Sequence, residues 1–179
     1  MNRICVFCGS RFGVDTKYSD AANILGKLLA SNGLVLVYGG SKIGLMGVIA
    51  DAVLEEGGEV IGVMPKDIVE REIAHNGLTE LKIVETMHQR KAEMIQLADG
   101  FIVLPGGMGT LDEFCEVITW VQLGYHNKPC GLLNTENYFK HFIEFYKNAV
   151  KQSFIKPEHR SLILVDDDPA NLLQRMIKS

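Results

Sequence analysis

The stretch Gly100–Phe114, GFIVLPGGMGTLDEF, determines how the rest of the sequence is interpreted. It begins with a short apolar run and continues through Pro105 and three glycines within four residues. The spacing of a helix then follows. Glycine has an entropic cost in an ordered backbone. This density of glycines therefore indicates that the backbone approaches another group closely. The stretch therefore predicts a buried strand, a tight loop and a helix, in that order.

The same order recurs along the chain. Short continuous runs rich in Val, Ile and Leu are typical of strands buried on both faces of a parallel sheet. The predicted strands are Arg3–Cys8, Leu34–Tyr38, Glu59–Met64, Leu81–Val84, Phe101–Leu104, Pro129–Leu133 and Ser161–Val165. The predicted helices are 15–31, 44–56, 86–98, 110–123, 136–151 and 168–178. This alternation predicts one domain over residues 1–179, an α/β fold of the doubly wound, Rossmann-like type with helices on both faces of a parallel sheet.

Local signals support three of the helix starts. Thr86–Gln89 and Thr110–Glu113 each have the pattern of a capping box, and Asp168 precedes a proline at a first helical position. The run Asp166–Asp168 could indicate a metal site, but carboxylates at a helix start explain it better. The segment Pro65–Glu80 has no clear period, and long connections of this kind are often functional.

Composition excludes several classes of protein. The chain has 179 residues, 47% of them apolar, and a net charge of −4, so disorder and general nucleic-acid binding are both disfavoured. No apolar run reaches the length of a membrane span, and the N-terminus, MNRICVFCGS, lacks a signal-peptide pattern. We expect a cytoplasmic protein without membrane or nucleic-acid partners.

Cys5 and Cys8 have the spacing of a redox or zinc pair, but they begin inside a predicted strand. Residues three apart on a strand point to opposite faces. No second pair or nearby histidine completes a zinc set. We therefore expect buried, reduced cysteines and no metal.

In doubly wound folds, ligands bind outside the carboxyl ends of the strands. Five features fall at that edge: Gly9–Ser10, the cluster Gly39–Gly47, the connection Pro65–Glu80 with Glu70 and Glu72, Met87–Lys91, and Pro105–Thr110. Neither glycine cluster is a GxGxxG fingerprint, and no GK[ST] sequence exists. The exposed N–H groups of the second cluster at a helix start predict an anion site suited to phosphate, with Arg90 and Lys91 adding positive charge.

Glu113 has two interpretations. As the third residue of a capping box it would only reach back to Thr110. Beside a bound phosphate, its carboxylate would instead stabilise a developing cation, such as the ribose carbon that loses its base. The plainer alternatives for Arg90 and Glu72 are an exposed helix charge and a solvated loop residue.

The residues PGGMGTLDE at 105–113 resemble the PGGxGTxxE signature of the Lonely Guy family, the cytokinin riboside 5′-monophosphate phosphoribohydrolases. The resemblance covers nearly the whole chain. Its further motifs are CGS at 8–10, YGGSKIGLMG at 38–47, Pro65 with REI at 71–73, MHQRKAEM at 87–94 and EVITWVQLG at 116–124. Relatives are often labelled lysine decarboxylase-like, but the chain is small for a pyridoxal-phosphate enzyme and no lysine stands out as a Schiff-base former.

The resemblance implies hydrolysis of the N-glycosidic bond of a nucleoside 5′-monophosphate whose base is adenine or an N6-modified adenine, giving free base and ribose 5-phosphate. It implies Arg90 and Glu113 as the catalytic pair, no cofactor and a homodimer. The implied substrate-site residues are Ser10, Gly40, Glu72, Met87, Lys91, Gly106, Gly107, Met108, Gly109, Thr110, Leu111, Asp112 and Thr119. Ser10-Arg11 and Asp112-Glu113 depart from the Ser-Ser and Glu-Glu common in the family, which bears on substrate preference.

Two other functions remain open on the residues alone. A nucleotide-binding or sensing module would bind the same ligand without turnover and would not need Glu113. A dinucleotide-dependent oxidoreductase would need an acid after the second strand, and Tyr38–Gly40 offers none.

Overall fold

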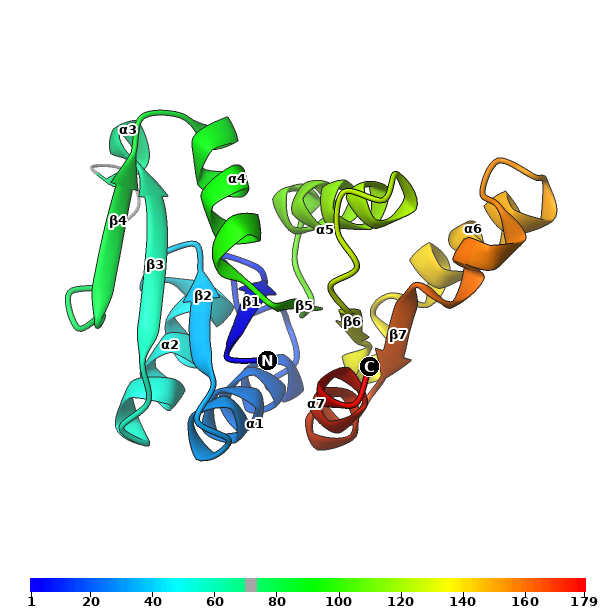
Figure 1. Ribbon diagram of the computed structural model, residues 1–179. Helices are drawn as coiled ribbons and strands as arrows, with labels where there is room; N and C mark the ends of the chain where they lie inside the picture. Colours follow the sequence, from blue (N-terminus) through cyan, green and yellow to red (C-terminus); the bar gives the residue numbers. More distant parts are fainter. Residues whose placement is uncertain (70–73) are drawn as a thin grey trace.

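The computed structural model describes residues 1–69 and 74–179 and contains one sheet of seven parallel strands in the order β4-β3-β2-β1-β5-β6-β7 (Figure 1). The strands are β1 (Arg3–Phe7), β2 (Val35–Tyr38), β3 (Val60–Pro65), β4 (Glu80–Val84), β5 (Gly100–Val103), β6 (Cys130–Leu133) and β7 (Ile163–Asp166). The α-helices are α1 (Lys17–Ser31), α2 (Gly44–Glu55), α3 (Lys66–Val69), α4 (Met87–Leu97), α5 (Met108–Gln122), α6 (Lys140–Lys151) and α7 (Pro169–Ile177). Two 3-10 helices, η1 (Thr135–Asn137) and η2 (Pro157–Ser161), flank α6.

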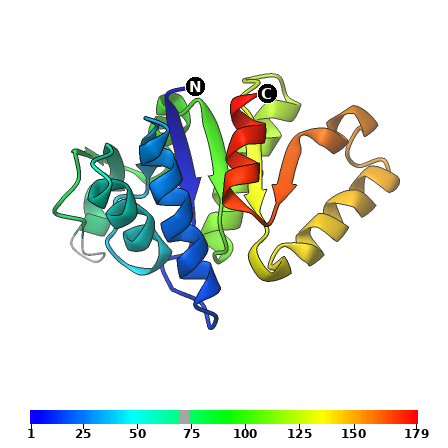
Figure 2. The same cartoon turned by 90° about the horizontal axis from the view of Figure 1, so that it is seen from below.

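Helices cover both faces of the sheet, as predicted. Buried side chains of α1, α2 and α7 form the core on one face, and those of α4, α5 and α6 form the core on the other. Figure 2 shows α1 and α7 side by side on the same face. The central strands are buried on both faces, which explains why their sequences are continuously apolar rather than alternating.

The order in which strands are added to the sheet reverses between β1 and β5. From β1 it winds outward through β2 and β3 to β4, then returns to place β5 on the other side of β1. The loops that follow β1 and β5 therefore meet at the carboxyl edge, where the Gly9 N–H donates to the Pro105 carbonyl at 3.0 Å. This is the topological switch point at which doubly wound folds bind ligands.

Cys5 and Cys8 are buried and unpaired, as predicted. Cys5 lies in the core beneath α4 and α5, whereas Cys8 lies in the core beneath α1 and α2. Both thiols are buried and free, and burial raises the pKa of each thiol. Within residues 1–69 and 74–179, no cluster of His, Cys, Asp or Glu is arranged to hold a metal ion.

One predicted cap is wrong. α5 begins at Met108 with Gly107 as its N-cap and no side-chain capping bond, so Thr110 lies in the first turn and Glu113 in the second. Thr110 is buried against Gly106 instead of closing a capping box. The predicted caps of two other helix starts are confirmed: Thr86 forms a capping box with Gln89 at α4, and Asp168 is the N-cap of α7.

Other differences lie at element ends. The predicted helix 136–151 starts at Lys140, because Glu136 and Asn137 have φ angles of 52° and 57° that an α-helix cannot contain. A 3-10 helix occupies the predicted start of the last strand, so β7 begins at Ile163. The connection Pro65–Glu80 contains the short helix α3. No helix in the described part of the chain has the length and apolar character of a membrane span.

Candidate active site

The loop from β5 to α5 contains glycines with different structural roles. A Cβ on Gly106 would overlap the Thr110 hydroxyl and come within 2.8 Å of the Gly9 nitrogen, so close packing of two loops requires glycine there. A Cβ on Gly107 or Gly109 would meet no atom within 4 Å. Gly107 has a φ of −87°, which any residue adopts. Contacts in the described chain therefore do not explain these two glycines, which leave open space at the start of α5.

This open space lies where α5 presents its first N–H groups. The first N–H groups of a helix have no partner within the helix, and here the N-cap residue Gly107 has no side chain to accept from them. Together with the positive end of the helix dipole, they make an anion site. The predicted phosphate site thus has the required backbone, shifted two residues toward the N-terminus relative to the predicted helix start.

Arg90 reaches this space from the first turn of α4. Its Nε donates to the Val63 carbonyl at the end of β3 at 3.1 Å, which fixes the direction of the side chain. Gly39 lies directly against the guanidinium, and a Cβ there would overlap Arg90 Nη2. The glycine after β2 is therefore needed to let Arg90 pass. Only 14% of the Arg90 side chain is exposed, which excludes the plainer interpretation of a solvated helix charge.

Glu113 faces Arg90 from the second turn of α5. Its Oε1 lies 3.5 Å from Arg90 Nη1, and 12% of its side chain is exposed. Burial raises the pKa of the Glu113 carboxyl, and the Arg90 guanidinium partly offsets this rise. Because Glu113 makes no capping bond, its interpretation as a cap is also excluded. A largely buried acid and a largely buried arginine therefore share one site, and the acid does not cap the helix.

Both side chains line a cavity of about 290 Å³ at the carboxyl edge of β1 and β5. This volume is near the lower end of the range of about 300–1,000 Å³ typical of small-molecule sites. The cavity is lined by Val6, Phe7, Cys8, Gly9, Ser10, Gly39, Met46, Arg90, Met94, Gly107, Met108, Gly109, Thr110 and Glu113. It combines the uncapped start of α5 at one wall with the ion pair of Arg90 and Glu113 at another.

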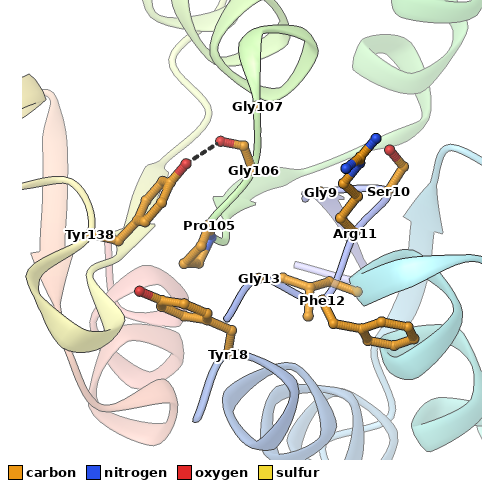
Figure 3. A pocket seen from close by; sticks show the side chains of 11 residues that line it. Gly9, Ser10, Arg11, Phe12, Gly13, Tyr18, Pro105, Gly106, Gly107 and Tyr138 are labelled. Carbon is orange, nitrogen blue, oxygen red and sulfur yellow. Dashed lines mark hydrogen bonds between the residues drawn. The ribbon is translucent and has the colours of Figure 1, made fainter. Parts of the chain in front are cut away.

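A second cavity of about 310 Å³ adjoins the first across Gly9, Ser10 and Gly107. Figure 3 shows Tyr18 and Tyr138 on one side of it and the loop Gly9–Gly13 on the other. The Tyr138 hydroxyl donates to the Gly106 carbonyl at 2.6 Å. Sequence reasoning missed both tyrosines. Tyr138 follows β6 at the same sheet edge, and this position in the sequence could have marked it as a candidate site residue.

The structure brings most of the predicted glycine-loop residues into these cavities. Ser10 and Gly107 line both, Gly106 lines the second, and Met108, Gly109 and Thr110 line the first. Met87 lies outside them but contacts Arg90, since its Sδ accepts from Arg90 Nη1 at 3.4 Å. Leu111 packs against the core behind the helix.

Four other predicted residues line neither cavity: Gly40, Lys91, Asp112 and Thr119. The Lys91 ammonium pairs with Asp112 at 3.1 Å and Glu116 at 3.2 Å, so it joins α4 to α5 rather than facing the glycine loop. Gly40, with a φ of 83°, turns the chain after β2 and does not line either cavity. Thr119 is exposed two turns beyond Asp112, and its hydroxyl donates to the Cys115 carbonyl. Glu72 falls outside the described residues.

Comparison with known proteins agrees with the motifs. A family model described as "Possible lysine decarboxylase" matches residues 46–176. A cytokinin riboside 5′-monophosphate phosphoribohydrolase of Arabidopsis thaliana is 51% identical over 97% of this chain and 82% of its own length. An enzyme of the same name from Rhodococcoides fascians is 49% identical over 92% of this chain and 84% of its own.

Solved structures share the fold. The molybdenum cofactor binding protein of Rippkaea orientalis superposes with a TM-score of 0.75 over 99% of this chain and 96% of its own, at 19% identity. Identity this low supports the architecture alone. The two enzymes are identical to this chain at about half of the matched positions, over more than nine tenths of its length. The chain therefore belongs to the Lonely Guy family of phosphoribohydrolases, whose sequence model carries the description of possible lysine decarboxylases.

Proposed function

We propose that the protein hydrolyses the N-glycosidic bond of a nucleoside 5′-monophosphate and releases the free base and ribose 5-phosphate. The observation that carries this proposal is the largely buried Arg90–Glu113 pair, which lines one cavity together with the uncapped start of α5. The names of the enzymes that are about half identical to the chain support cytokinin riboside 5′-monophosphates as substrates. We include AMP in the proposal because both have an adenine ribose 5′-phosphate framework.

In this mechanism, the N–H groups from Gly107 to Thr110 bind the 5′-phosphate and place the ribose beside Glu113. The C1′–N bond breaks with its electron pair going to the base, the oxygen of a water molecule bonds to C1′, and the base gains the proton that this water loses. The Glu113 carboxylate stabilises the positive charge that develops on the sugar and orients or deprotonates this water. Arg90 holds the phosphate or ribose and supports departure of the base.

Lys91 supports the site indirectly in this proposal. Its two ion pairs hold α4, which carries Arg90, against α5, which carries Glu113. Its charge is already offset by Asp112 and Glu116, so we assign phosphate binding to the helix start and Arg90. We further propose a homodimer in the cytoplasm. The free thiols agree with a reducing compartment.

The test is release of free base from AMP, from its N6-isopentenyl analogue and from adenosine, followed by chromatography. Charge-assisted hydrogen bonds contribute roughly 1.5–3 kcal/mol each, and a nucleoside loses several of them together. Adenosine should therefore react at least ~10³-fold more slowly than AMP in kcat/KM. Comparable rates would show that the glycine loop does not bind a phosphate. Tight AMP binding without base release, unaffected by Glu113→Ala, would identify a sensing module instead.

A further inference from the structure

Tyr138 contacts the glycine loop from outside the cavity that contains Arg90 and Glu113. Its hydroxyl donates to the Gly106 carbonyl at 2.6 Å, the bond drawn in Figure 3. The distance is short for a bond between a hydroxyl and a carbonyl, so the contact is well formed. The mechanism described above does not use this residue.

The Gly106 carbonyl and the Gly107 N–H belong to the same peptide unit. The described peptides are all trans, and in a planar trans peptide the C=O and N–H bonds point in opposite directions. A carbonyl held toward Tyr138 therefore turns the Gly107 N–H away from the second cavity. Gly107, Gly109 and Thr110 line the first cavity, whereas Tyr138 lines only the second.

Several contacts fix Tyr138 in place. It follows Glu136 and Asn137, two non-glycine residues in the left-handed region, where such residues have a conformational cost. Glu136 is anchored to α1 by an ion pair with Lys17 at 2.8 Å. The Tyr138 ring meets the Tyr18 ring edge-on, with centroids 5.9 Å apart. This costly turn presents Tyr138 to the loop and places the next residue, Phe139, in the core.

We propose that Tyr138 is a positioning residue for phosphate binding. By holding the Gly106 carbonyl, its hydroxyl keeps the Gly106–Gly107 peptide in the orientation that points the Gly107 N–H at the 5′-phosphate. The inference rests on the proposed function, because it concerns the same anion site. Without the hydroxyl, this peptide can rotate, and one donor to the phosphate is no longer pre-oriented.

Tyr138→Phe tests this, since it keeps the ring contacts and removes only the hydroxyl. We expect kcat/KM for AMP to fall about 3- to 10-fold, mainly through KM, as expected for loss of one hydrogen bond. The constant for competitive inhibition by inorganic phosphate should rise by a similar factor. The rate with adenosine, measured at high enzyme concentration, should change less than about 2-fold because adenosine has no phosphate to misplace. Tyr18→Phe is the matched control, because it leaves the bond to Gly106 intact and should preserve the ratio of AMP to adenosine rates.

Equal losses for AMP and adenosine would show a merely structural effect and overturn the inference. An unchanged inhibition constant for phosphate would overturn it as well. Both results leave the proposed function standing if the unmodified enzyme still prefers AMP to adenosine. Wild-type enzyme without that preference would overturn the proposed function and this inference together.

Discussion

At the scale of residues, the site depends on where side chains are absent as much as on Arg90 and Glu113. Gly39 leaves the space that the Arg90 guanidinium occupies, and Gly106 lets the loops after β1 and β5 touch. Gly107 and Gly109 face open space. Glycine in a helix has a stability cost of about 1 kcal/mol relative to alanine, so Gly109 in the first turn of α5 indicates a functional reason.

Gly107→Ala and Gly106→Ala form a matched pair of variants. The Cβ at residue 107 meets no protein atom, so this variant should keep its melting temperature but lose at least ~10-fold in kcat/KM for AMP, because the methyl group occupies the space proposed for phosphate. The Cβ at residue 106 overlaps Thr110, so that variant should lose stability by roughly 1–3 kcal/mol as well as activity. Thermal unfolding and base release on both variants check this. Full activity in Gly107→Ala would contradict the proposed position of the phosphate.

Glu113→Gln should separate chemistry from structure. The amide keeps the shape of the side chain but cannot act as a base or carry a negative charge, so kcat should fall by about 10²-fold or more. Stability should change by less than ~1 kcal/mol, because Glu113 caps no helix. Steady-state kinetics and urea unfolding provide the two numbers. Near-normal turnover with a large loss of stability would assign the residue a structural role.

The raised pKa of Glu113 predicts the pH dependence of activity. The carboxylate is the active form, so kcat/KM should fall as the pH drops through this raised pKa, above the range of an ordinary glutamate. The effect on stability has the opposite sign. A raised folded-state pKa stabilises the fold below the unfolded-state pKa, and that contribution is lost as the pH rises through the folded-state pKa. As the pH falls, activity should therefore drop while protonation of Glu113 adds to stability.

Measurement of kcat/KM and melting temperature between about pH 5 and pH 8 tests this relation. The residual activity of Glu113→Gln should lack the acid limb that belongs to this carboxyl. An acid limb retained unchanged in that variant would assign it to another group.

At the scale of elements, the position of each helix start decides which residue enters the site. The capping box of Thr86 starts α4 so that Arg90 emerges in its first turn, above the end of β3. α5 starts at the glycine loop without a side-chain cap, which leaves its first N–H groups for a ligand. α7 has the conventional Asp168 cap and lies on the opposite face of the sheet.

Thr86→Ala and Asp168→Ala should therefore have different effects on KM for AMP but similar effects on the free energy of unfolding. Each removes one N-cap bond, to Gln89 and Asn171 respectively, and each should lower the free energy of unfolding by about 1 kcal/mol. Only Thr86→Ala frays the helix that holds Arg90, so only that variant should raise KM for AMP several-fold. Urea unfolding and steady-state kinetics on both variants test this. An equal rise in KM for AMP in both variants would mean that general destabilisation, not the position of Arg90, limits activity.

At the scale of the whole molecule, the order of the strands brings together loops that are far apart in sequence. The reversal between β1 and β5 sets Gly9 against Pro105, and α4 returns across the sheet to place Arg90 beside Glu113. The same arrangement leaves apolar side chains uncovered near α5. Met108, Leu123 and Tyr125 are 79%, 61% and 73% exposed.

The homodimer stays a prediction, and we expect Leu123 and Tyr125, which are exposed just beyond α5, to contact the partner. Large apolar side chains that remain exposed together mark association surfaces. Light scattering at micromolar concentration should give twice the mass of the chain, and Leu123→Glu combined with Tyr125→Glu should give a monomer. Phe154→Glu alters a residue that is 88% exposed beyond α6 and should leave the dimer intact. A monomeric wild-type protein would contradict the prediction.

Local sequence was enough for the elements and for the chemistry of two side chains. Continuous apolar runs gave the seven strands, because strands buried on both faces tolerate few polar residues. The glycine loop before α5 predicted an anion site, and Glu113 and Arg90 were predicted to share it. The start of α5 was wrong by two residues, because Thr110–Glu113 has the pattern of a capping box but Thr110 packs against Gly106.

The sequence by itself therefore determined which segments form strands and helices and which residue types meet at the carboxyl edge. Only the tertiary structure decided that Lys91 pairs with Asp112 and Glu116, that Gly39 makes room for Arg90 and that Tyr138 holds the Gly106 carbonyl. The physical reason is the separation in sequence between the residues that interact. Apolar periodicity and capping act within a few residues, whereas these contacts join segments brought together by the order of the strands, which local patterns do not encode.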